Sequence, residues 1–251
     1  MRAGTGATGE QVRAMFGRIA PRYDFLNHLL SLNIDRYWRL RTVRRLALLL
    51  CRPDARVLDL CCGSGDLMLA LEVRRGAGVL ASDFCHPMLL EARRKMVKKH
   101  SRSALFESDA LRLPLAGESL DLVTIAFGFR NLIDYRAGLA EMLRVLRPGG
   151  LAAILEFSTP PNGAFRRLYE FYSRRLLPRI GGAISGSPEA YEYLPESVRR
   201  FPDAEDLAEA MRGAGFQEVE FQRMTLGAVA LHLGRAPTPR RTPSPSPERS
   251  A

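Results

Sequence analysis

The chain has 251 residues, a formal net charge of +10 at pH 7 and a hydrophobic fraction of 46%, which suits one α/β domain with insertions or two small domains. No apolar stretch is long enough for a transmembrane helix, and residues 1–11 lack the apolar core of a signal peptide, so we expect a cytoplasmic protein. Its four cysteines do not predict a disulfide framework in that compartment.

The two ends of the chain differ in composition from its centre. Residues 1–11 are small and polar, and residues 235–251 are rich in Pro, Ser and Arg. Neither segment can bury a core, so both are predicted to be disordered. Residues 12–234 are predicted to form one domain. Its first part, residues 12–50, has a helical pattern broken at Pro21 and is expected to form a helical lid.

After the lid, short apolar runs alternate with helical patterns. The expected strands are 56–60, 78–82, 105–108, 120–126 and 151–157, and the expected helices are 65–72, 87–100 and 136–146. A Pro-Gly-Gly sequence at 148–150 is expected to stop the last helix. Alternation of this kind predicts a parallel sheet whose ligands bind beyond the carboxyl ends of the strands.

The remainder of the domain does not follow this alternation. Residues 159–202 are aromatic and proline-rich, and they are predicted to form a helical insertion over the strand tips. A helix at 204–214 follows, and the apolar runs 217–223 and 228–233 predict a closing hairpin.

The most informative segment is the turn after the first expected strand. Its residues 61–65 are small, with Asp59 before them and Asp66 after them. Glycines allow a ligand to approach the backbone closely, but the third glycine of the dinucleotide pattern is missing and the acids disfavour a pyrophosphate. A sulfonium with an amino-acid tail suits this field, so S-adenosylmethionine is favoured over a nicotinamide or flavin dinucleotide. An α/β domain without a ligand is the remaining alternative.

Polar side chains also follow the next three expected strands. Asp83 ends the second strand, where a carboxylate can hold both ribose hydroxyls. Asp109 and Ala110 follow the third strand and can meet the adenine amino group and a ring nitrogen, although Asp109 can also simply cap a turn. Arg130 follows the fourth strand, where a transferring methyl group should emerge; an ordinary ion pair is its alternative role.

At these residues the chain resembles the menaquinone/ubiquinone-biosynthesis C-methyltransferases (UbiE/MenG type) over roughly residues 12–234. The resemblance is carried by residues 15–39, 58–66, 83–85, 127–131 and 155–158. Its most specific part is residues 180–202, which include Tyr193-Leu194-Pro195-Glu196-Ser197 and Phe201-Pro202. One departure is Asp35, which stands where the family usually has a histidine.

The resemblance implies a class I S-adenosylmethionine-dependent methyltransferase fold. This is a Rossmann-like α/β fold with a mostly parallel seven-stranded sheet, a terminal antiparallel hairpin, N-terminal helices and a helical substrate-binding insertion. It also implies methyl transfer to a ring carbon of a polyprenylated quinol, either demethylmenaquinol or the methoxy-benzoquinol of ubiquinone synthesis. An RNA or other small-molecule methyltransferase is the alternative, but the sequence lacks an Asn-Pro-Pro-Tyr or catalytic cysteine motif.

The expected site residues form three groups, and no metal ligands are expected. Arg130 and Tyr191 are the candidate catalytic residues; Arg130 would stabilise phenolate charge, because a pKa above about 12 excludes it as a free base. The substrate-binding residues are expected to be Phe127, Asn131 and Tyr193. The cofactor-binding residues are expected to be Tyr23, Trp38, Asp59, Gly63, Ser64, Gly65, Asp83, Asp109 and Ala110.

Positive charge is concentrated at the two ends of the chain. Residues 13–45 carry eight arginines against two aspartates, a local charge of +6, and residues 235–251 carry +3. Basic surface attracts nucleic acid or anionic lipid, although a solvated face is the simpler explanation. Because aromatic residues alternate with the arginines, we expect segment 13–45 to rest peripherally on the inner face of the membrane. No nucleic-acid partner is expected. The sequence does not decide whether the chain forms a homodimer or joins a quinone-biosynthesis complex.

Overall fold

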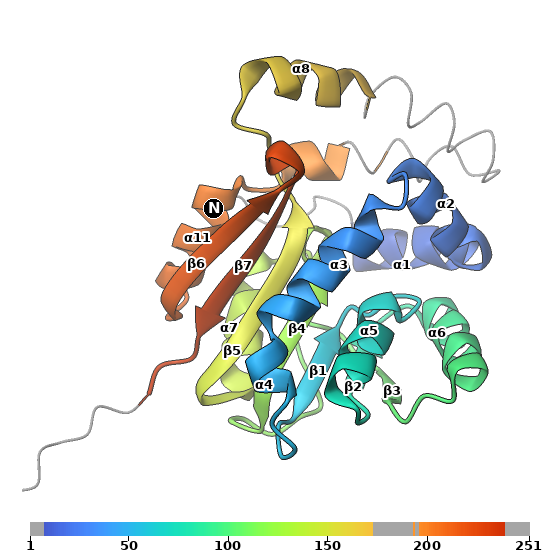
Figure 1. Cartoon of the computed structure of the whole chain (residues 1–251), viewed down its shortest axis with the longest axis vertical. Coiled ribbons are helices and arrows are strands. Elements are labelled where there is room, and N and C mark those ends of the chain that lie inside the picture. The colour runs from blue at the N-terminus through green and yellow to red at the C-terminus, as the bar shows by residue number, and fades with distance from the viewer. Residues whose placement is uncertain (1–7, 173–192, 194–195, 239–251) are drawn as a thin grey trace, which may run out of the picture.

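The computed structural model describes residues 8–172, 193 and 196–238 (Figure 1). It contains a seven-stranded sheet with the strand order β3-β2-β1-β4-β5-β7-β6. Neighbouring strands are parallel except that β7 runs antiparallel to both β5 and β6. The mostly parallel sheet and its closing hairpin are therefore confirmed. The strands are β1 (Val57–Leu60), β2 (Leu80–Asp83), β3 (Ala104–Glu107), β4 (Leu120–Ala126), β5 (Leu146–Phe157), β6 (Gln217–Met224) and β7 (Val229–Arg235).

Helices cover both faces of the sheet. The α-helices are α1 (Gly9–Ile19), α2 (Tyr23–Leu30), α3 (Ile34–Arg45), α4 (Ala47–Leu50), α5 (Asp66–Arg75), α6 (His86–Lys99), α7 (Tyr135–Val145), α8 (Gly163–Phe171) and α11 (Ala204–Gly213). The short 3-10 turns are η1 (Ala20–Arg22), η2 (Phe129–Asn131) and η4 (Thr225–Gly227). Helices α7 and α11 share one hydrophobic core with the sheet, and α3, α4 and α5 share a second one.

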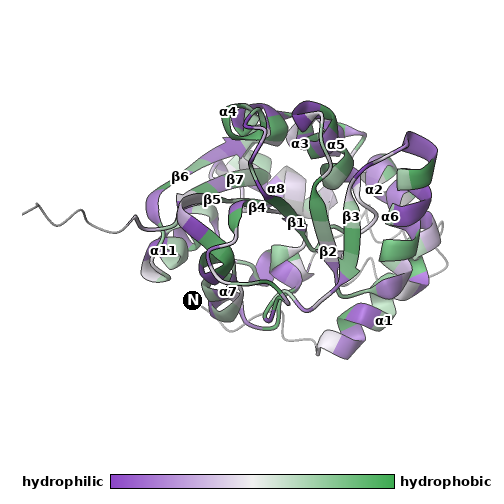
Figure 2. Ribbon diagram, turned by 90° about the horizontal axis from the view of Figure 1, so that it is seen from below, coloured by the Kyte–Doolittle hydropathy of each residue, from purple (hydrophilic) through white to green (hydrophobic). Residues whose placement is uncertain are grey.

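The pattern of burial explains why these elements form. The central strand β4 is buried along almost its whole length and has an apolar sequence, as a strand covered on both faces requires. Helix α7 buries Leu139, Met142 and Val145 on one side, and Asp134 caps its amino end. Figure 2 shows the apolar colouring of the central strands β1 and β4 between these helices.

Several element boundaries differ from those predicted, and two of these differences have a clear structural cause. Helix α1 starts at Gly9 rather than residue 12, because Thr8 and Gln11 form a capping box. Strand β5 begins at Leu146 rather than residue 151 and includes the Pro-Gly-Gly sequence that was expected only to stop the preceding helix, because Leu146 already pairs with Leu120. Ala236 exchanges backbone hydrogen bonds with residues 149 and 150, so the ordered domain extends past residue 234.

The lid and the insertion lie at the carboxyl end of the parallel strands. Residues 12–50 are helical as predicted, and Pro21 lies in the 3-10 turn η1 that separates α1 from α2. Of the insertion predicted at 159–202, α8 and the helical residues 196–200 are described. Disorder was predicted for residues 1–11 and 235–251, but residues 9–11 belong to α1 and Arg235 ends β7. Residues 1–7 and 239–251 lie outside the described residues. Within the described ranges, no helix combines the length and apolar character needed to cross a bilayer.

Candidate active site

A cavity of about 1020 Å³ lies at the carboxyl ends of the parallel strands, beneath the lid helices. In doubly wound folds this is where ligands bind, at the point where the strand order reverses between β1 and β4. The cavity brings together most of the residues predicted for the site. Those that line it are Tyr23, Trp38, Asp59, Gly63, Ser64, Asp83, Asp109, Ala110, Phe127, Arg130 and Asn131.

The turn after β1 has the backbone shape that its glycines allow. Gly63 and Gly65 have φ values of +55° and +85°, in the left-handed region. A Cβ atom on Gly65 would lie 3.0 Å from Met68 Cε and 3.3 Å from Ala92 Cβ. Gly65 does not line the cavity itself; it precedes the first residue of α5 and allows the chain to turn tightly beside the cavity.

Asp83 is buried at the end of β2 and organises this turn. Its carboxylate accepts hydrogen bonds from the Gly63 N–H at 2.8 Å and the Cys85 N–H at 2.9 Å. Burial raises the pKa of Asp83, and the backbone hydrogen bonds oppose that increase. Each carboxylate oxygen can accept a further hydrogen bond, so Asp83 is able to hold ribose hydroxyls while it fixes the turn.

Asp59 presents an incompletely bonded carboxylate at the end of β1. Its Oδ1 accepts a hydrogen bond from the Thr124 hydroxyl at 2.8 Å, while Oδ2 has no hydrogen-bond partner within the described part of the chain. Burial raises the pKa of Asp59 to about 7. A buried acceptor without a partner is costly, so this position favours a cationic ligand group. Arg39 lines the same cavity. Asp59 and Arg39 together therefore suit an amino-acid tail, whose ammonium matches the aspartate and whose carboxylate matches the arginine.

Asp109 and Ala110 lie at the end of β3 as predicted. Asp109 Oδ1 accepts a hydrogen bond from the Leu111 N–H at 2.9 Å, which makes it a turn-capping residue. The side chain is nonetheless exposed and lines the cavity. Both roles considered for Asp109 are therefore compatible with its position.

Arg130 and Glu156 form a buried ion pair in the cavity wall. The Arg130 NH1 atom lies 2.9 Å from Glu156 Oε1 and also donates to the Phe127 carbonyl oxygen. The guanidinium carbon lies 5.2 Å from the centre of the Phe157 ring. Burial opposes the charge, but the Glu156 carboxylate prevails and raises the pKa of Arg130, so the guanidinium stays charged. The ion pair considered as an alternative for Arg130 exists, and the residue also faces the cavity.

Tyr23 and Tyr169, from other elements, line the same cavity as this ion pair. Burial raises the pKa of Tyr23, and the charge of Arg130 opposes this increase. Burial raises the pKa of Tyr169, on α8, to about 12, again against the effect of Arg130. Tyr193 donates a hydrogen bond to Asn131 Oδ1 at 3.1 Å. Tyr191, the second predicted catalytic residue, lies outside the described residues.

Trp38 and Phe127 belong to an aromatic cluster between α3 and the tips of β4 and β5. The ring centre of Trp38 lies 5.8 Å from that of Phe127 and 6.2 Å from that of Phe157. The Trp38 indole N–H donates to the Thr225 hydroxyl at 2.8 Å. This hydrogen bond ties the lid to the turn η4, so Trp38 positions the lid as well as lining the cavity.

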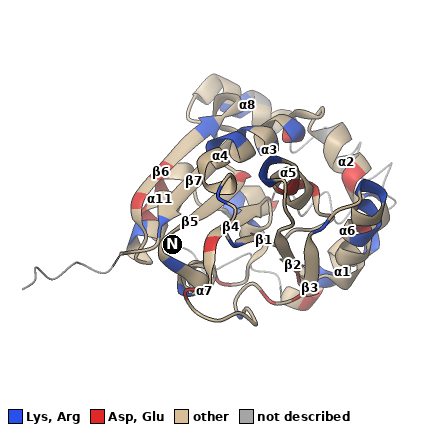
Figure 3. Cartoon of the chain, turned by 60° about the horizontal axis from the view of Figure 1, so that its bottom comes forward, with Lys and Arg blue, Asp and Glu red and all other residues tan. Residues whose placement is uncertain are grey.

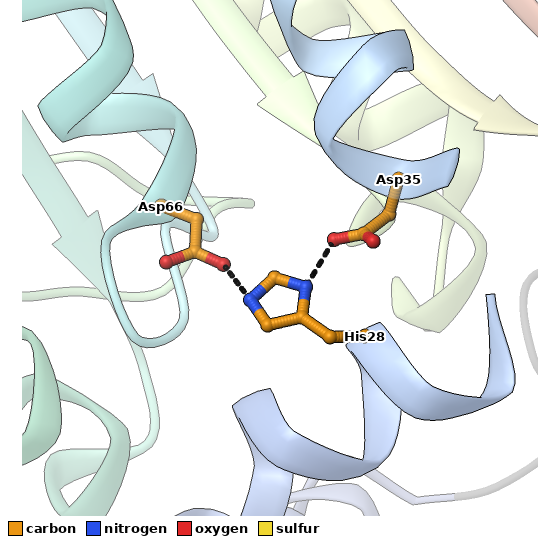
Figure 4. Close-up of side chains that lie close together, drawn as sticks. All are labelled: His28, Asp35 and Asp66. Atoms are coloured by element: carbon orange, nitrogen blue, oxygen red, sulfur yellow. Dashed lines mark hydrogen bonds and ion pairs between the residues drawn. The ribbon is translucent and has the colours of Figure 1, made fainter. Parts of the chain in front are cut away.

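Sequence reasoning missed a charged cluster between the lid and the cofactor turn. Ser64 donates to Asp24 and accepts a hydrogen bond from Lys95 at 3.1 Å, and Lys95 pairs with Asp66 at 2.5 Å. Figure 4 shows His28, from α2, between Asp35 of α3 and Asp66 of α5. The only signal in the sequence was the i,i+4 spacing of Asp24 with His28 and of Asp35 with Arg39, which places each pair on one helix face.

Comparison with known proteins agrees with this geometry. Residues 4–236 match the ubiE/COQ5 methyltransferase family. The chain belongs to this family. It is 49% identical over 224 residues to the demethylmenaquinone methyltransferase of Thermus thermophilus, covering 89% of this chain and 100% of the relative. It is 45% identical to the demethylmenaquinone methyltransferase of Deinococcus radiodurans, covering 90% of this chain and 92% of the relative.

Solved structures agree on the fold. A possible histamine N-methyltransferase from Thermotoga maritima aligns with a TM-score of 0.63 at 18% identity, covering 89% of this chain and 98% of that one. The [4+2]-cyclase SpnF aligns with a TM-score of 0.65 at 16% identity, covering 94% and 100%. The family match and these alignments confirm the predicted class I methyltransferase fold, and the chain is a methyltransferase that uses S-adenosylmethionine.

The carboxyl group of Asp59 leads to a prediction about pH. Because its pKa is raised to about 7, Asp59 is mostly protonated near pH 6 and mostly ionised near pH 8, and the ionised form attracts the cationic methionine end of the cofactor. We expect the affinity for S-adenosylmethionine to rise severalfold between about pH 6 and about pH 8. The Asp59→Asn variant should bind more weakly and lose most of this increase. Calorimetric titrations across this range test the prediction, and an equal pH dependence in both proteins contradicts it.

Proposed function

We propose that the protein methylates a ring carbon of a polyprenylated quinol, converting demethylmenaquinol to menaquinol. The observation that carries this proposal is the Arg130 guanidinium, charged and held against Phe157 in the wall of the cofactor cavity. Both relatives named above are demethylmenaquinone methyltransferases and align with nearly the whole chain. Methoxy-benzoquinol, the corresponding substrate in ubiquinone synthesis, is a second candidate because it needs the same chemistry.

The composition of the cavity supports an apolar ring substrate beside the cofactor. The carboxylates of Asp59 and Asp83 line the cavity together with many aromatic and aliphatic side chains. A volume of about 1020 Å³ is ample for a cofactor and a bicyclic ring together. Its apolar lining includes Phe16, Leu111, Leu132, Ile133, Phe157, Phe165, Tyr169, Phe171 and Tyr172.

The side chains around Arg130 suit carbon methylation. A quinol carbon becomes nucleophilic when an adjacent hydroxyl loses its proton and pushes electron density into the ring. Bound S-adenosylmethionine would supply an electrophilic methyl group and leave as S-adenosylhomocysteine, and the methylated ring carbon would then lose its proton to solvent. Arg130 stabilises the developing negative charge on the quinol oxygen, and its ion pair with Glu156 fixes its position before the reaction. Asn131 and Tyr193, joined by a hydrogen bond, and Tyr23 are able to orient the quinol ring.

The alternative of an RNA methyltransferase with a catalytic cysteine has little support in the site. Burial raises the pKa values of Cys61 and Cys62 well above the ordinary value, so both thiols stay protonated and poorly nucleophilic. The direct test incubates the purified chain and labelled S-adenosylmethionine with demethylmenaquinol, methoxy-benzoquinol or total RNA. Label transferred to RNA but to neither quinol contradicts the proposal, and the preferred quinol identifies the ring.

We also propose that the lid rests on an anionic membrane surface, where a polyprenyl quinol resides. Large apolar side chains are exposed on α2 and α3 and on the turn between them, among them Phe25 at 60% and Leu32 at 73% exposure, together with Tyr37 and Leu40. Arg36 and Arg44 are exposed on α3, the helix that also carries Tyr37 and Leu40. Figure 3 shows the basic residues of α3. Exposed apolar groups beside cations favour the interface of an anionic bilayer.

This proposal predicts reversible, salt-sensitive binding to anionic vesicles that survives deletion of residues 237–251. The double variant Phe25→Ser and Leu32→Ser should reduce recovery in vesicle flotation severalfold, because it removes two apolar side chains that insert into the bilayer. Leu48→Ser is the matched control, since Leu48 is 92% exposed on α4, outside the segment 13–45 that is proposed to contact the membrane. Equal recovery on neutral and anionic vesicles, or loss of binding on deleting the tail alone, contradicts the proposal.

A further inference from the structure

Lys95, on α6, contacts both the lid and the cofactor turn, residues 61–66. Its ammonium nitrogen lies 2.5 Å from Asp24 Oδ2 and 2.5 Å from Asp66 Oδ1. It also donates a hydrogen bond to the Ser64 hydroxyl at 3.1 Å. Asp24 belongs to lid helix α2, whereas Ser64 and Asp66 belong to the turn. One cation from a third element therefore joins the lid to the turn.

A further hydrogen bond joins the same groups. The Ser64 hydroxyl donates to Asp24 Oδ1 while it accepts from Lys95, so it is used in both directions. Ser64 is buried, and the side chains of Lys95 and Asp24 are only 24% and 31% exposed. Salt screens partly buried charges less than exposed ones, so this ion pair should hold more firmly than one on the open surface. We call the contacts of Asp24 with Lys95 and Ser64 the lid latch.

Helix α2 relies on polar contacts to keep its position. None of its described side chains is fully buried, whereas α1 buries Val12, Met15 and Ile19. Helix α3 likewise buries Trp38 and Val43. An element with few buried apolar contacts opens at a low cost in free energy. Of the lid helices α1, α2 and α3, α2 is therefore the one that can leave the turn most easily.

The residue before Asp24 covers the cofactor turn from the side of the cavity. Tyr23 lines the cavity, and a Cβ atom built on Gly63 would lie 3.9 Å from its ring. Among the described residues that line the cavity, neither Asp24 nor Lys95 is found. The lid latch therefore does not act by touching a bound ligand. It can act by holding Tyr23 over the turn.

We propose that Lys95 is a positioning residue that keeps α2 closed over the cofactor turn through the lid latch, and that opening of the latch limits the release of S-adenosylhomocysteine. This inference rests on the proposed assignment of the cavity to S-adenosylmethionine. While the latch is closed, Tyr23 lies across the turn and the product stays bound. When α2 moves away, the turn is uncovered and the product leaves.

The rate of S-adenosylhomocysteine release from the full chain tests the proposal in the absence of any quinol. Trp38 is the single tryptophan of the chain and lines the cavity, so its fluorescence is suited to report binding. In stopped-flow experiments, the dependence of the observed rate on ligand concentration gives the association and dissociation rate constants separately. The variants are Lys95→Met, which keeps an apolar stem without the charge, and Asp24→Asn, which keeps the shape of the side chain.

We expect each single variant to release S-adenosylhomocysteine about fivefold faster than the native chain, without slower association. The double variant should be no faster than the faster single variant, because both changes open the same latch. Lys95→Arg, which keeps the positive charge, should release the product more slowly than Lys95→Met. The matched control is Arg94→Met, which should keep the native rate, because Arg94 lies on the same helix but pairs with Glu91 and is 72% exposed.

Native dissociation rates in both Lys95→Met and Asp24→Asn overturn the proposal, as do effects of the two changes that multiply in the double variant. Slower association with an unchanged dissociation rate also overturns it, because the latch then shapes the site without limiting release. Thermal unfolding shows which variants are folded, and Asp24→Asn decides alone if Lys95→Met does not fold. If the native chain does not bind S-adenosylhomocysteine at all, the cofactor assignment itself is wrong, and the proposal with it.

Discussion

Replacing Arg130 by alanine is expected to remove most of the methyltransferase activity and to lower thermal stability. Arg130 and Glu156 are both almost fully buried, so removing one partner leaves an uncompensated charge that costs about 3–5 kcal/mol. Turnover should fall by roughly 10²–10³-fold, because a donor aimed at developing oxygen charge is lost. Affinity for the cofactor should change much less. Steady-state kinetics, calorimetry and thermal unfolding measure these effects separately.

A second variant separates stability from catalysis. Arg130→Ala combined with Glu156→Gln removes the unpaired charge and should recover much of the lost thermal stability, but not the turnover. Arg235→Ala is the control for loss of an arginine, because its ion pair with Glu218 is exposed and distant from the cavity. If Arg130→Ala abolishes cofactor binding yet leaves turnover per bound cofactor intact, the catalytic role is wrong.

The fold followed from local patterns that survive in any tertiary context. Strands such as β4 are mostly apolar because helices cover both faces, and that pattern is visible in the sequence despite Asp121 and Thr124. Two of the boundary errors arose where a tertiary or backbone contact decided the outcome. The pairing of Leu146 with Leu120 extends β5 backward, and the capping box of Thr8 and Gln11 extends α1.

The candidate site was predictable to the extent that it lies at strand ends. Carboxyl ends of parallel strands meet at one edge, so Asp59, Asp83 and Asp109 had to come close together. The ion-pair and hydrogen-bond partners of the site residues were harder to predict from the sequence. Glu156 was visible at the end of β5, but its pairing with Arg130 depends on the adjacency of β4 and β5. The contacts of His28 depend on how two lid helices dock on α5, which no local pattern specifies.

Asp83→Ala is expected to weaken S-adenosylmethionine binding at least tenfold. The substitution removes a buried carboxylate that can hold the ribose hydroxyls, and a hydrogen bond to a charged group contributes about 1.5–3 kcal/mol. It also leaves the N–H groups of Gly63 and Cys85 without their acceptor, which loosens the turn. Asp83→Asn retains one acceptor oxygen, so it should lose less affinity than alanine. Isothermal titration calorimetry measures both variants.

The matched control for Asp83 is Asp203→Ala. Asp203 also accepts a backbone hydrogen bond, from Asp206 at 2.9 Å, but it caps α11 and does not line the cavity. Its loss should cost about 1 kcal/mol of stability through the helix cap and leave cofactor affinity unchanged. Unchanged affinity in Asp83→Ala would remove Asp83 from the cofactor site. Of the two aspartates, only Asp83 adjoins the glycine turn. Equal losses of cofactor affinity in Asp83→Ala and Asp203→Ala would therefore show that the effect is one of general stability.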